Sequence, residues 1–165
     1  MTNAATQPGP AQLFDRARLL IDLDEATDPD SPASSLLVLG LPRPGEERVT
    51  FSTSEIEELV VHLRDRLAEL VGANGSVYRT RSTELCAFID GKLSPSDDLL
   101  DSIRTELELE CEPLAVRVSL GCVSLPGEAG EPTAALALAD ERARLSQGHT
   151  VLHLPSRGTP RAGAA

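Results

Sequence analysis

The chain has 165 residues, a formal net charge of -11, 41% hydrophobic residues and 2% aromatic ones. This length suits one compact domain with an aliphatic core. The negative charge and the few rings available for base stacking exclude an ordinary nucleic-acid-binding domain. No signal peptide is evident, and no apolar stretch approaches the ~20 residues of a membrane span. We expect a cytoplasmic protein without a membrane or nucleic-acid partner.

The N-terminal third of the chain predicts a disordered segment and then a helix. Residues 1–11 are small, polar and rich in Pro and Gly, which is typical of disorder. A helix is expected from Gln12. Its apolar positions recur at three- and four-residue steps: Leu13, Ala17, Leu20 and Ile21. Pro29 and Pro32 end this helix, because proline disfavours helical geometry in the residue before it.

A buried strand and a capped helix follow. Residues 36–39 are a continuous apolar run, typical of a strand covered on both faces, and the run ends at Gly40. Ser52 and Ser54 each precede a glutamate by three residues, which predicts a capping box, and Gly72 is a plausible C-terminal cap. The apolar stripe of this helix is Ile56, Leu59, Val60, Leu63, Leu67 and Leu70.

The middle of the chain predicts a hairpin and a third helix. Residues 77–80 and 85–89 form two strands joined across Arg81, Ser82 and Thr83. The third helix opens at Ser94-Pro95, with serine as the cap and proline in the first turn. Its buried side is Leu100, Ile103 and Leu107.

The C-terminal third predicts a strand, a helix and a short last strand. Residues 116–122 alternate apolar and polar side chains, as in a strand with one covered face. A helix is expected over 133–146, a strand over 151–154, and a disordered tail over 155–165. This order of elements predicts an α/β domain of the α+β kind over residues 12–154, with helices flanking a mixed, mostly antiparallel sheet.

The cysteines and histidines predict no metal site. Cys86 and Cys122 lie in strand-like runs and are interpreted as small buried hydrophobic residues. The odd number of cysteines indicates no disulfide framework. His62, His149 and His153 lack a third ligand at a suitable spacing and are interpreted as structural or surface residues.

Several segments, taken in order, resemble the GGDEF domain of diguanylate cyclases. Residues 77–88 are similar to the signature hairpin, with Arg79 ahead of Arg81, Ser82, Thr83, Glu84 and Leu85. Residues 116–122 are similar to a hydrophobic-Ser-hydrophobic-Gly strand of the family, and Ala139-Asp140 to its Ala-Asp pair. Phe14-Asp15-Arg16 is similar to the early Asn-Arg. The resemblance implies a fold of the nucleotidyl-cyclase and polymerase-palm kind over nearly the whole chain.

The resemblance also implies a chemistry that these residues do not support. Family members join two GTP molecules into cyclic di-GMP with two Mg²⁺ ions, which require carboxylate ligands. The position of the first metal-binding Asp is Gly40, and the acidic third position of the signature is Thr83. Glu84 alone keeps a carboxylate. The two glycines that admit the nucleotide are Arg81 and Ser82 here.

Other functional positions of the family are also altered. Residues 42–49 offer no counterpart to the guanine-recognising Asn and Asp. The Lys that contacts the triphosphate corresponds to Gln147 or Leu145, and the Arg to His149. The product-inhibition pair falls on Gly72 and Gly75.

The sequence therefore favours a catalytically inactive GGDEF-like domain that acts as a regulatory or protein-interaction module in bacterial signalling. It predicts no catalytic residue, no metal and no cofactor. The expected partner is another protein, and a homodimer stays open. The first alternative is a non-catalytic sensor of GTP or cyclic di-GMP, in which Arg79, Arg81 and Glu84 contribute to a remodelled pocket. An active diguanylate cyclase with relocated ligands ranks last.

Overall fold

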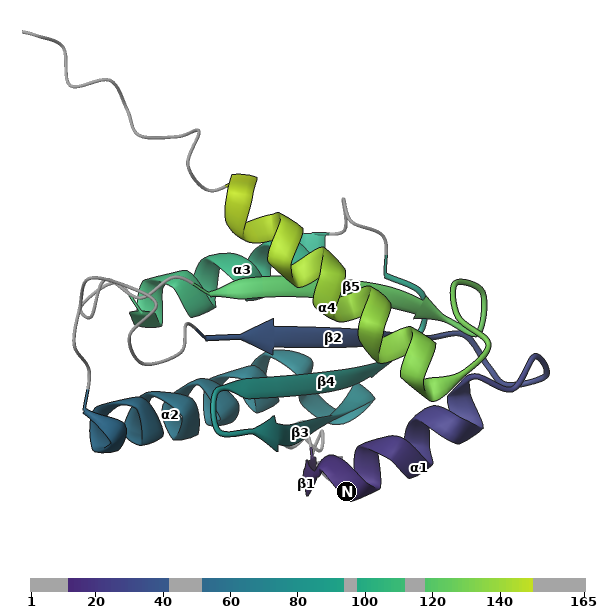
Figure 1. Ribbon diagram of the computed structural model, residues 1–165, viewed down its shortest axis with the longest axis horizontal. Helices are drawn as coiled ribbons and strands as arrows, with labels where there is room; N and C mark the ends of the chain where they lie inside the picture. The colour runs from purple at the N-terminus through teal and green to yellow at the C-terminus, as the bar shows by residue number, and fades with distance from the viewer. Residues whose placement is uncertain (1–11, 42–51, 94–97, 112–117, 150–165) are drawn as a thin grey trace, which may run out of the picture.

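The computed structural model describes residues 12–41, 52–93, 98–111 and 118–149. Its elements are, in order, β1 (Gln12–Asp15), α1 (Arg16–Ala26), β2 (Ser34–Gly40), α2 (Thr53–Val71), a 3-10 turn η1 (Gly72–Asn74), β3 (Gly75–Arg81), β4 (Glu84–Asp90), α3 (Asp98–Cys111), β5 (Ser119–Leu125) and α4 (Pro132–His149) (Figure 1). The predicted cap at Ser94 and the predicted strand over 151–154 lie outside the described residues.

The five strands form one sheet in the order β1-β3-β4-β2-β5. β1 runs parallel to β3, and every other neighbouring pair is antiparallel. The predicted mixed, mostly antiparallel sheet is therefore confirmed. β2 lies between β4 and β5, and its buried residues reflect helices on both faces of the sheet.

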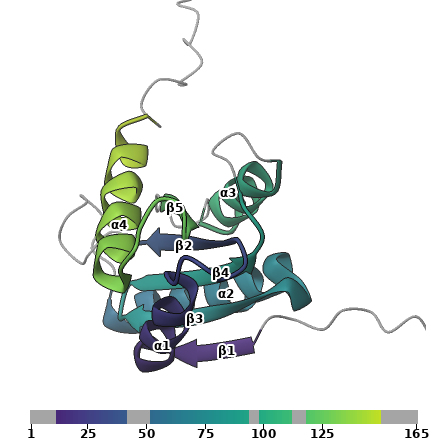
Figure 2. The same cartoon turned by 90° about the vertical axis from the view of Figure 1, so that its right-hand side faces the viewer.

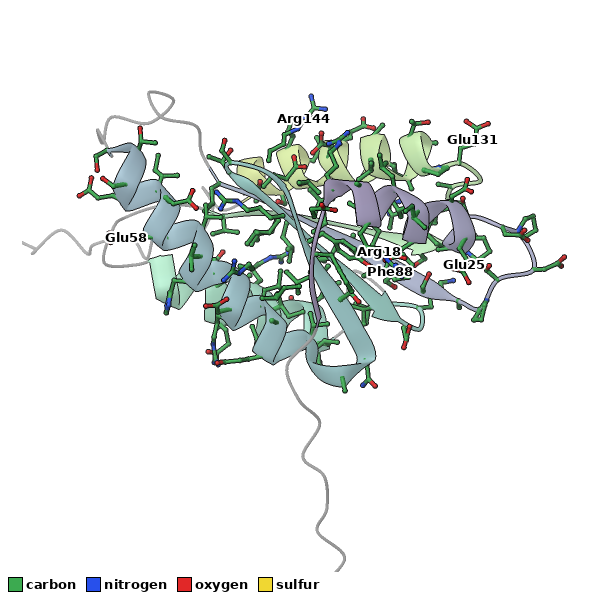
Figure 3. The ribbon with its side chains drawn as sticks, turned by 90° about the horizontal axis from the view of Figure 1, so that it is seen from below. Arg18, Glu25, Glu58, Phe88, Glu131 and Arg144 are labelled. Atoms are coloured by element: carbon green, nitrogen blue, oxygen red, sulfur yellow. The ribbon has the colours of Figure 1, made fainter. Side chains whose placement is uncertain are left out.

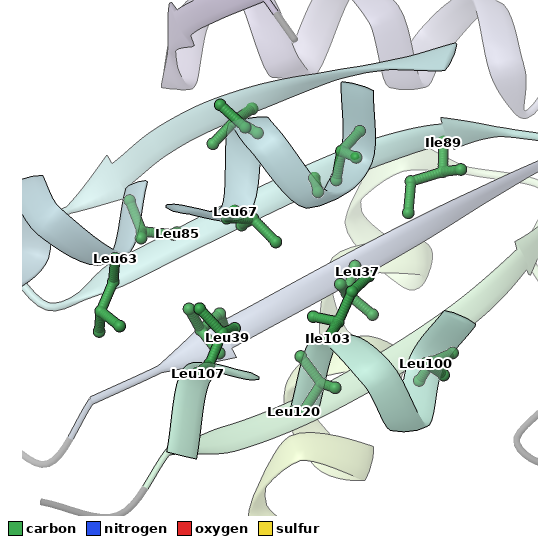
Figure 4. Packing of buried hydrophobic residues seen from close by; sticks show 14 of the residues in the cluster. Leu37, Leu39, Leu63, Leu67, Leu85, Ile89, Leu100, Ile103, Leu107 and Leu120 are labelled. Carbon is green, nitrogen blue, oxygen red and sulfur yellow. The ribbon is translucent and has the colours of Figure 1, made fainter. Parts of the chain in front are cut away.

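The helices cover the two faces in pairs, with α1 and α4 on one face and α2 and α3 on the other (Figure 2). The α2–α3 face holds the larger hydrophobic cluster, in which α2, α3 and the sheet bury mostly leucines (Figure 4). The α1–α4 face holds the second cluster, which includes Leu19, Leu23, Tyr78 and Ala139. Along the central strands, alternate buried residues therefore contribute to the two cores.

Local signals place α2 as predicted. The Ser52 hydroxyl accepts a hydrogen bond from the Glu55 N–H at 3.3 Å, and the Glu55 carboxylate accepts from the Ser52 N–H at 2.8 Å. Together these bonds form the expected capping box. Gly72 follows the helix with a φ of 65°, a left-handed conformation that favours glycine.

The expectation for the first helix is wrong in its start and in its buried face. Residues 12–15 are a strand, because they pair with Ser76–Arg79 of β3. Asp15 then caps α1 by accepting a hydrogen bond from the Arg18 N–H at 3.0 Å. The buried residues of α1 are Leu19, Leu23 and Ala26, whereas Leu20 and Ile21 are exposed.

The prediction that the strand over 116–122 has only one covered face is also wrong. β5 begins at Ser119, and both of its faces are largely buried. Leu120 belongs to the α2–α3 cluster and Val123 to the α1–α4 cluster. Alternating polarity had indicated one covered face, but Ser119 and Ser124 are buried as hydrogen-bonded hydroxyls.

No helix within the described ranges has both the length and the apolar character needed to cross a bilayer.

Candidate functional site

The positions matched to the metal ligands of the family meet at one end of the sheet. Gly40 ends β2, where it pairs with Glu84 of β4 on one side and with Ser119 of β5 on the other. The Leu41 N–H donates to the Thr83 carbonyl at 2.9 Å, which holds the hairpin turn beside the end of β2. Figure 1 shows the β3–β4 turn and the end of β2 on the same side of the molecule.

Gly40 leaves no open space for an acidic side chain. A Cβ atom added there would lie 2.6 Å from the Ser119 hydroxyl oxygen, which itself donates to the Gly40 carbonyl at 3.2 Å. An aspartate at this position would therefore require the Ser119 side chain to rotate away.

Glu84 supplies one carboxylate, and that carboxylate already has partners. Its Oε1 atom accepts a hydrogen bond from the Thr80 hydroxyl at 2.6 Å, and its Oε2 atom lies 3.8 Å from the Arg81 guanidinium. The adjacent Thr83 offers a neutral hydroxyl, a weak ligand for Mg²⁺ compared with a carboxylate.

The residues present do not fit the metal pair that the fold family implies. Two Mg²⁺ ions beside a triphosphate need several anionic oxygens, and among the matched positions Gly40, Thr83 and Glu84 only Glu84 carries a carboxylate. Across the four described ranges, no group of three or more His, Cys, Asp or Glu side chains is placed to hold a metal ion.

Arg79 is directed away from Arg81 and Glu84. Its guanidinium donates to both carboxylate oxygens of Glu57 in α2, at 2.6 and 2.5 Å, and to the Ser82 carbonyl at 3.2 Å. The bidentate pair lowers the pKa of Glu57 and raises that of Arg79. Of the proposed pocket residues, the structure thus brings together Arg81 and Glu84, while Arg79 is engaged by α2.

No sequence pattern indicates Glu57 as the partner of Arg79. The two residues are far apart in the chain, and Glu57 is one of several acids on the solvent side of α2. A pairing of this kind carries no local sequence signal, because it depends on how α2 packs against β3.

The last residue of the signature has a structural role. Leu85 is 1% exposed and packs in the α2–α3 cluster. Arg81 and Ser82 are exposed, and the strand register is irregular between Arg79 and Arg81. Side chains therefore occupy the turn where the family has two glycines.

The positions matched to the product-inhibition pair, Gly72 and Gly75, are glycines, and Gly75 has no space for a side chain. A Cβ atom at Gly75 would clash with the Phe88 carbonyl oxygen and lie 2.5 Å from Val71 Cγ1. Leu145, one option for the triphosphate-binding Lys position, is 62% exposed on α4. The side chains of Gln147 and His149, and all of residues 42–49, lie outside the described part.

The strand and helix motifs of the resemblance meet in space. A Cβ atom added to Gly121 of β5 would clash with the Ala139 carbonyl oxygen and lie 2.6 Å from the Ala143 nitrogen. Ala139 itself is fully buried. Small residues at both positions thus let the backbone of α4 approach β5 closely.

The fold matches solved GGDEF domains. The GGDEF domain of FimX from Pseudomonas aeruginosa has a TM-score of 0.67 at 17% identity, over 83% of this chain and 90% of that one. That of TpbB, also called YfiN, from the same organism has a TM-score of 0.61 at 18% identity, over 83% and 86%. The GGDEF domain of DgcB from Caulobacter crescentus, in complex with c-di-GMP, has a TM-score of 0.58 at 17% identity, over 91% and 92%.

The protein is therefore a GGDEF-like domain in its fold. More particularly, it spans nearly the whole of each of these domains rather than a fragment of one. No protein-family model and no curated protein matches the chain. At sequence identities below a fifth, the structural likeness shows the fold alone, so the chemistry has to be argued from the side chains.

Proposed function

We propose that this GGDEF-like domain does not synthesise cyclic di-GMP and acts in bacterial signalling as a regulatory or protein-interaction module. The supporting observation is the set of side chains at the end of β2 and the hairpin turn. Gly40, Thr83 and Glu84 converge there, and they offer a single carboxylate. Phosphoryl transfer between two nucleotides depends on metal ions that neutralise the phosphate charge.

The test of inactivity is an incubation of purified protein with GTP and Mg²⁺, followed by mass spectrometry for cyclic di-GMP. We expect no product above that of a heat-inactivated sample. Glu84→Gln is the matched control for contaminating cyclase. Cyclic di-GMP made by the wild type and absent with Glu84→Gln would overturn the proposal, because Glu84 would then be a working ligand.

The interaction half of the proposal is supported by apolar side chains exposed to solvent. On β1 and α1, Leu13 is 46% exposed, Leu20 37% and Ile21 63%. Leu20 and Ile21 are neighbours on α1, and adjoining exposed apolar side chains are a feature of protein contacts. We expect a specific partner captured from a native lysate to be lost with Ile21→Asp and retained with Leu145→Asp. A failure to capture any specific partner, or equal loss with both variants, contradicts this half.

A sensor of GTP or cyclic di-GMP is the competing function. Arg81 favours it, because its side chain is 53% exposed and its 3.8 Å contact with Glu84 is long enough to be exchanged for a phosphate. Arg79 disfavours it, because binding through Arg79 would break the pair with Glu57. Calorimetric titration with GTP and cyclic di-GMP, each with and without Mg²⁺, separates the two functions. Saturable binding that Arg81→Gln abolishes would establish the sensor.

A further inference from the structure

A pocket of about 330 Å³ lies between α1 and the sheet, at the end opposite the hairpin turn. Ser34 of β2 and Asp90 of β4 pair across the sheet and form part of its floor together with Phe88. Gly40 lies at the other end of β2, roughly 20 Å away at about 3.3 Å per residue. The pocket is thus separate from the positions matched to the cyclase site.

One buried hydroxyl in this pocket has no partner. Ser34 is 4% exposed, and its Oγ atom makes no hydrogen bond to any part of the chain that the structure describes. The adjacent Ser35 has the usual arrangement, since it donates to the Gly91 carbonyl and accepts from the Leu93 N–H, both at 2.8 Å. Buried hydroxyls are nearly always paired, so Ser34 Oγ, which has less than 1 Å² of exposed surface, is an unsatisfied atom that a ligand can bond if the adjoining side chains shift.

The α1 wall of the pocket holds two acids, of which one is paired with an arginine and the other has no side-chain partner among the described residues. Asp22 accepts a hydrogen bond from Arg18 Nε at 2.9 Å and another from the Tyr78 hydroxyl at 2.6 Å. Burial and the Asp22 carboxylate raise the pKa of Tyr78, so this hydroxyl stays a neutral donor. Glu25, one turn further along α1, is exposed and has no side-chain partner within the described ranges.

Asp90 is the second unpaired acid of the pocket. It is exposed at the end of β4 and, like Glu25, makes no side-chain hydrogen bond or ion pair to the described residues. The charges of Arg18 and Asp22 cancel, so Glu25 and Asp90 leave the pocket with an excess of two negative charges. The Phe88 ring on the floor adds an aromatic surface. Figure 3 shows Arg18, Glu25 and Phe88 grouped around α1.

We propose that this pocket binds a small aliphatic diamine. Its two ammonium groups would pair with the carboxylates of Glu25 and Asp90, and one N–H would donate to Ser34 Oγ. The methylene chain would lie against Phe88, whose ring also attracts a neighbouring cation. The site takes no part in the proposed loss of cyclase activity and does not depend on it.

Other ligand classes fit less well. An anion would meet the uncompensated charge of Glu25 and Asp90. The described residues provide no cluster of three ligands for a metal ion. The volume is at the lower end of the range for small-molecule pockets, which favours a compact ligand over an extended peptide.

The experiment is isothermal titration of the whole chain with 1,4-diaminobutane at 150 mM NaCl, alongside 1-aminobutane and a short lysine-bearing peptide. We expect saturable 1:1 binding of the diamine and binding about tenfold weaker for the monoamine, which loses one charge-assisted hydrogen bond. Glu25→Gln and Asp90→Asn should each weaken the diamine by about tenfold. Ser34→Ala should weaken it by about threefold to tenfold.

Glu58→Gln and Glu131→Gln are the matched controls, because each removes one exposed acid outside the pocket. They should change the affinity by less than about twofold. Equal weakening by pocket and control variants would mean diffuse attraction to the net charge and would overturn the proposal. So would the absence of saturable diamine binding, or tighter binding of the peptide than of the diamine. Circular dichroism of each variant identifies loss of fold.

Discussion

The close approach of α4 to β5 makes Gly121→Ala a demanding test of this structure. The added methyl group would lie 2.6 Å from the Ala143 nitrogen and closer still to the Ala139 carbonyl oxygen. Favourable contacts between such atoms begin near 3.5 Å, so α4 would have to retreat by roughly 1 Å. Both obstructing atoms belong to the backbone, and no change of rotamer can relieve the clash.

The expected loss in the free energy of unfolding is about 3 kcal/mol. Overpacking a core commonly costs about 1–3 kcal/mol, and the upper end applies when a backbone has to move. Moving α4 away from β5 would also loosen the packing of three buried residues of α4, namely Ala135, Ala139 and Ala143. For a chain of this size the melting temperature should fall by roughly 6–12 °C.

The assay is urea unfolding followed by circular dichroism, with Gly130→Ala as the matched control. A Cβ atom at Gly130 meets nothing within 4 Å, and its φ is not in the left-handed range. That substitution should be neutral or stabilise by up to about 1 kcal/mol, because it restricts the unfolded chain. If Gly121→Ala unfolds within about 0.5 kcal/mol of the wild type, the inferred contact between α4 and β5 is wrong.

Two further predictions concern titrating groups. Hydrogen bonds from Arg142, and then from the Ser124 N–H, lower the pKa of Glu128 from 4.5 to about 2. The stability from this pair is complete above pH 4.5 and is lost as the pH falls toward 2. Glu128→Gln should therefore cost about 1 kcal/mol at pH 7, a figure reduced for solvent screening. The difference between the urea midpoints of the wild type and Glu128→Gln should become smaller at pH 3. A difference that does not change with pH contradicts the lowered pKa of Glu128. Burial raises the pKa of the Cys86 thiol to about 12. After treatment with an alkylating reagent at pH 8, peptide mapping should therefore find Cys86 unmodified until urea is added. Alkylation of Cys86 in the native protein would refute its burial.

Part of the candidate site was predictable from the order of the residues along the chain. The resemblance assigned Gly40, Thr83 and Glu84 to one site, and the register of β2 against β4 brings them together. The partners of the arginines were not predictable. Glu57 reaches Arg79 only because α2 packs on that face of β3, and such long-range contacts leave no periodic signal.

The unpaired Ser34 hydroxyl was likewise beyond sequence reasoning. Nothing in the sequence separates Ser34 from Ser35, yet one faces the α1 pocket and the other is bonded to Gly91 and Leu93. Adjacent strand residues point to opposite faces, so the two serines meet different surroundings.

Elements whose stability is local were predictable from the order of residues alone. The capping box at Ser52, the apolar stripe of α2 and the continuous apolar run of β2 each act within a few residues. Long-range packing, by contrast, makes residues 12–15 a strand, selects the buried face of α1 and covers both faces of β5. Pairing and burial depend on segments far apart in the chain, whereas caps and periodicity depend on neighbouring residues.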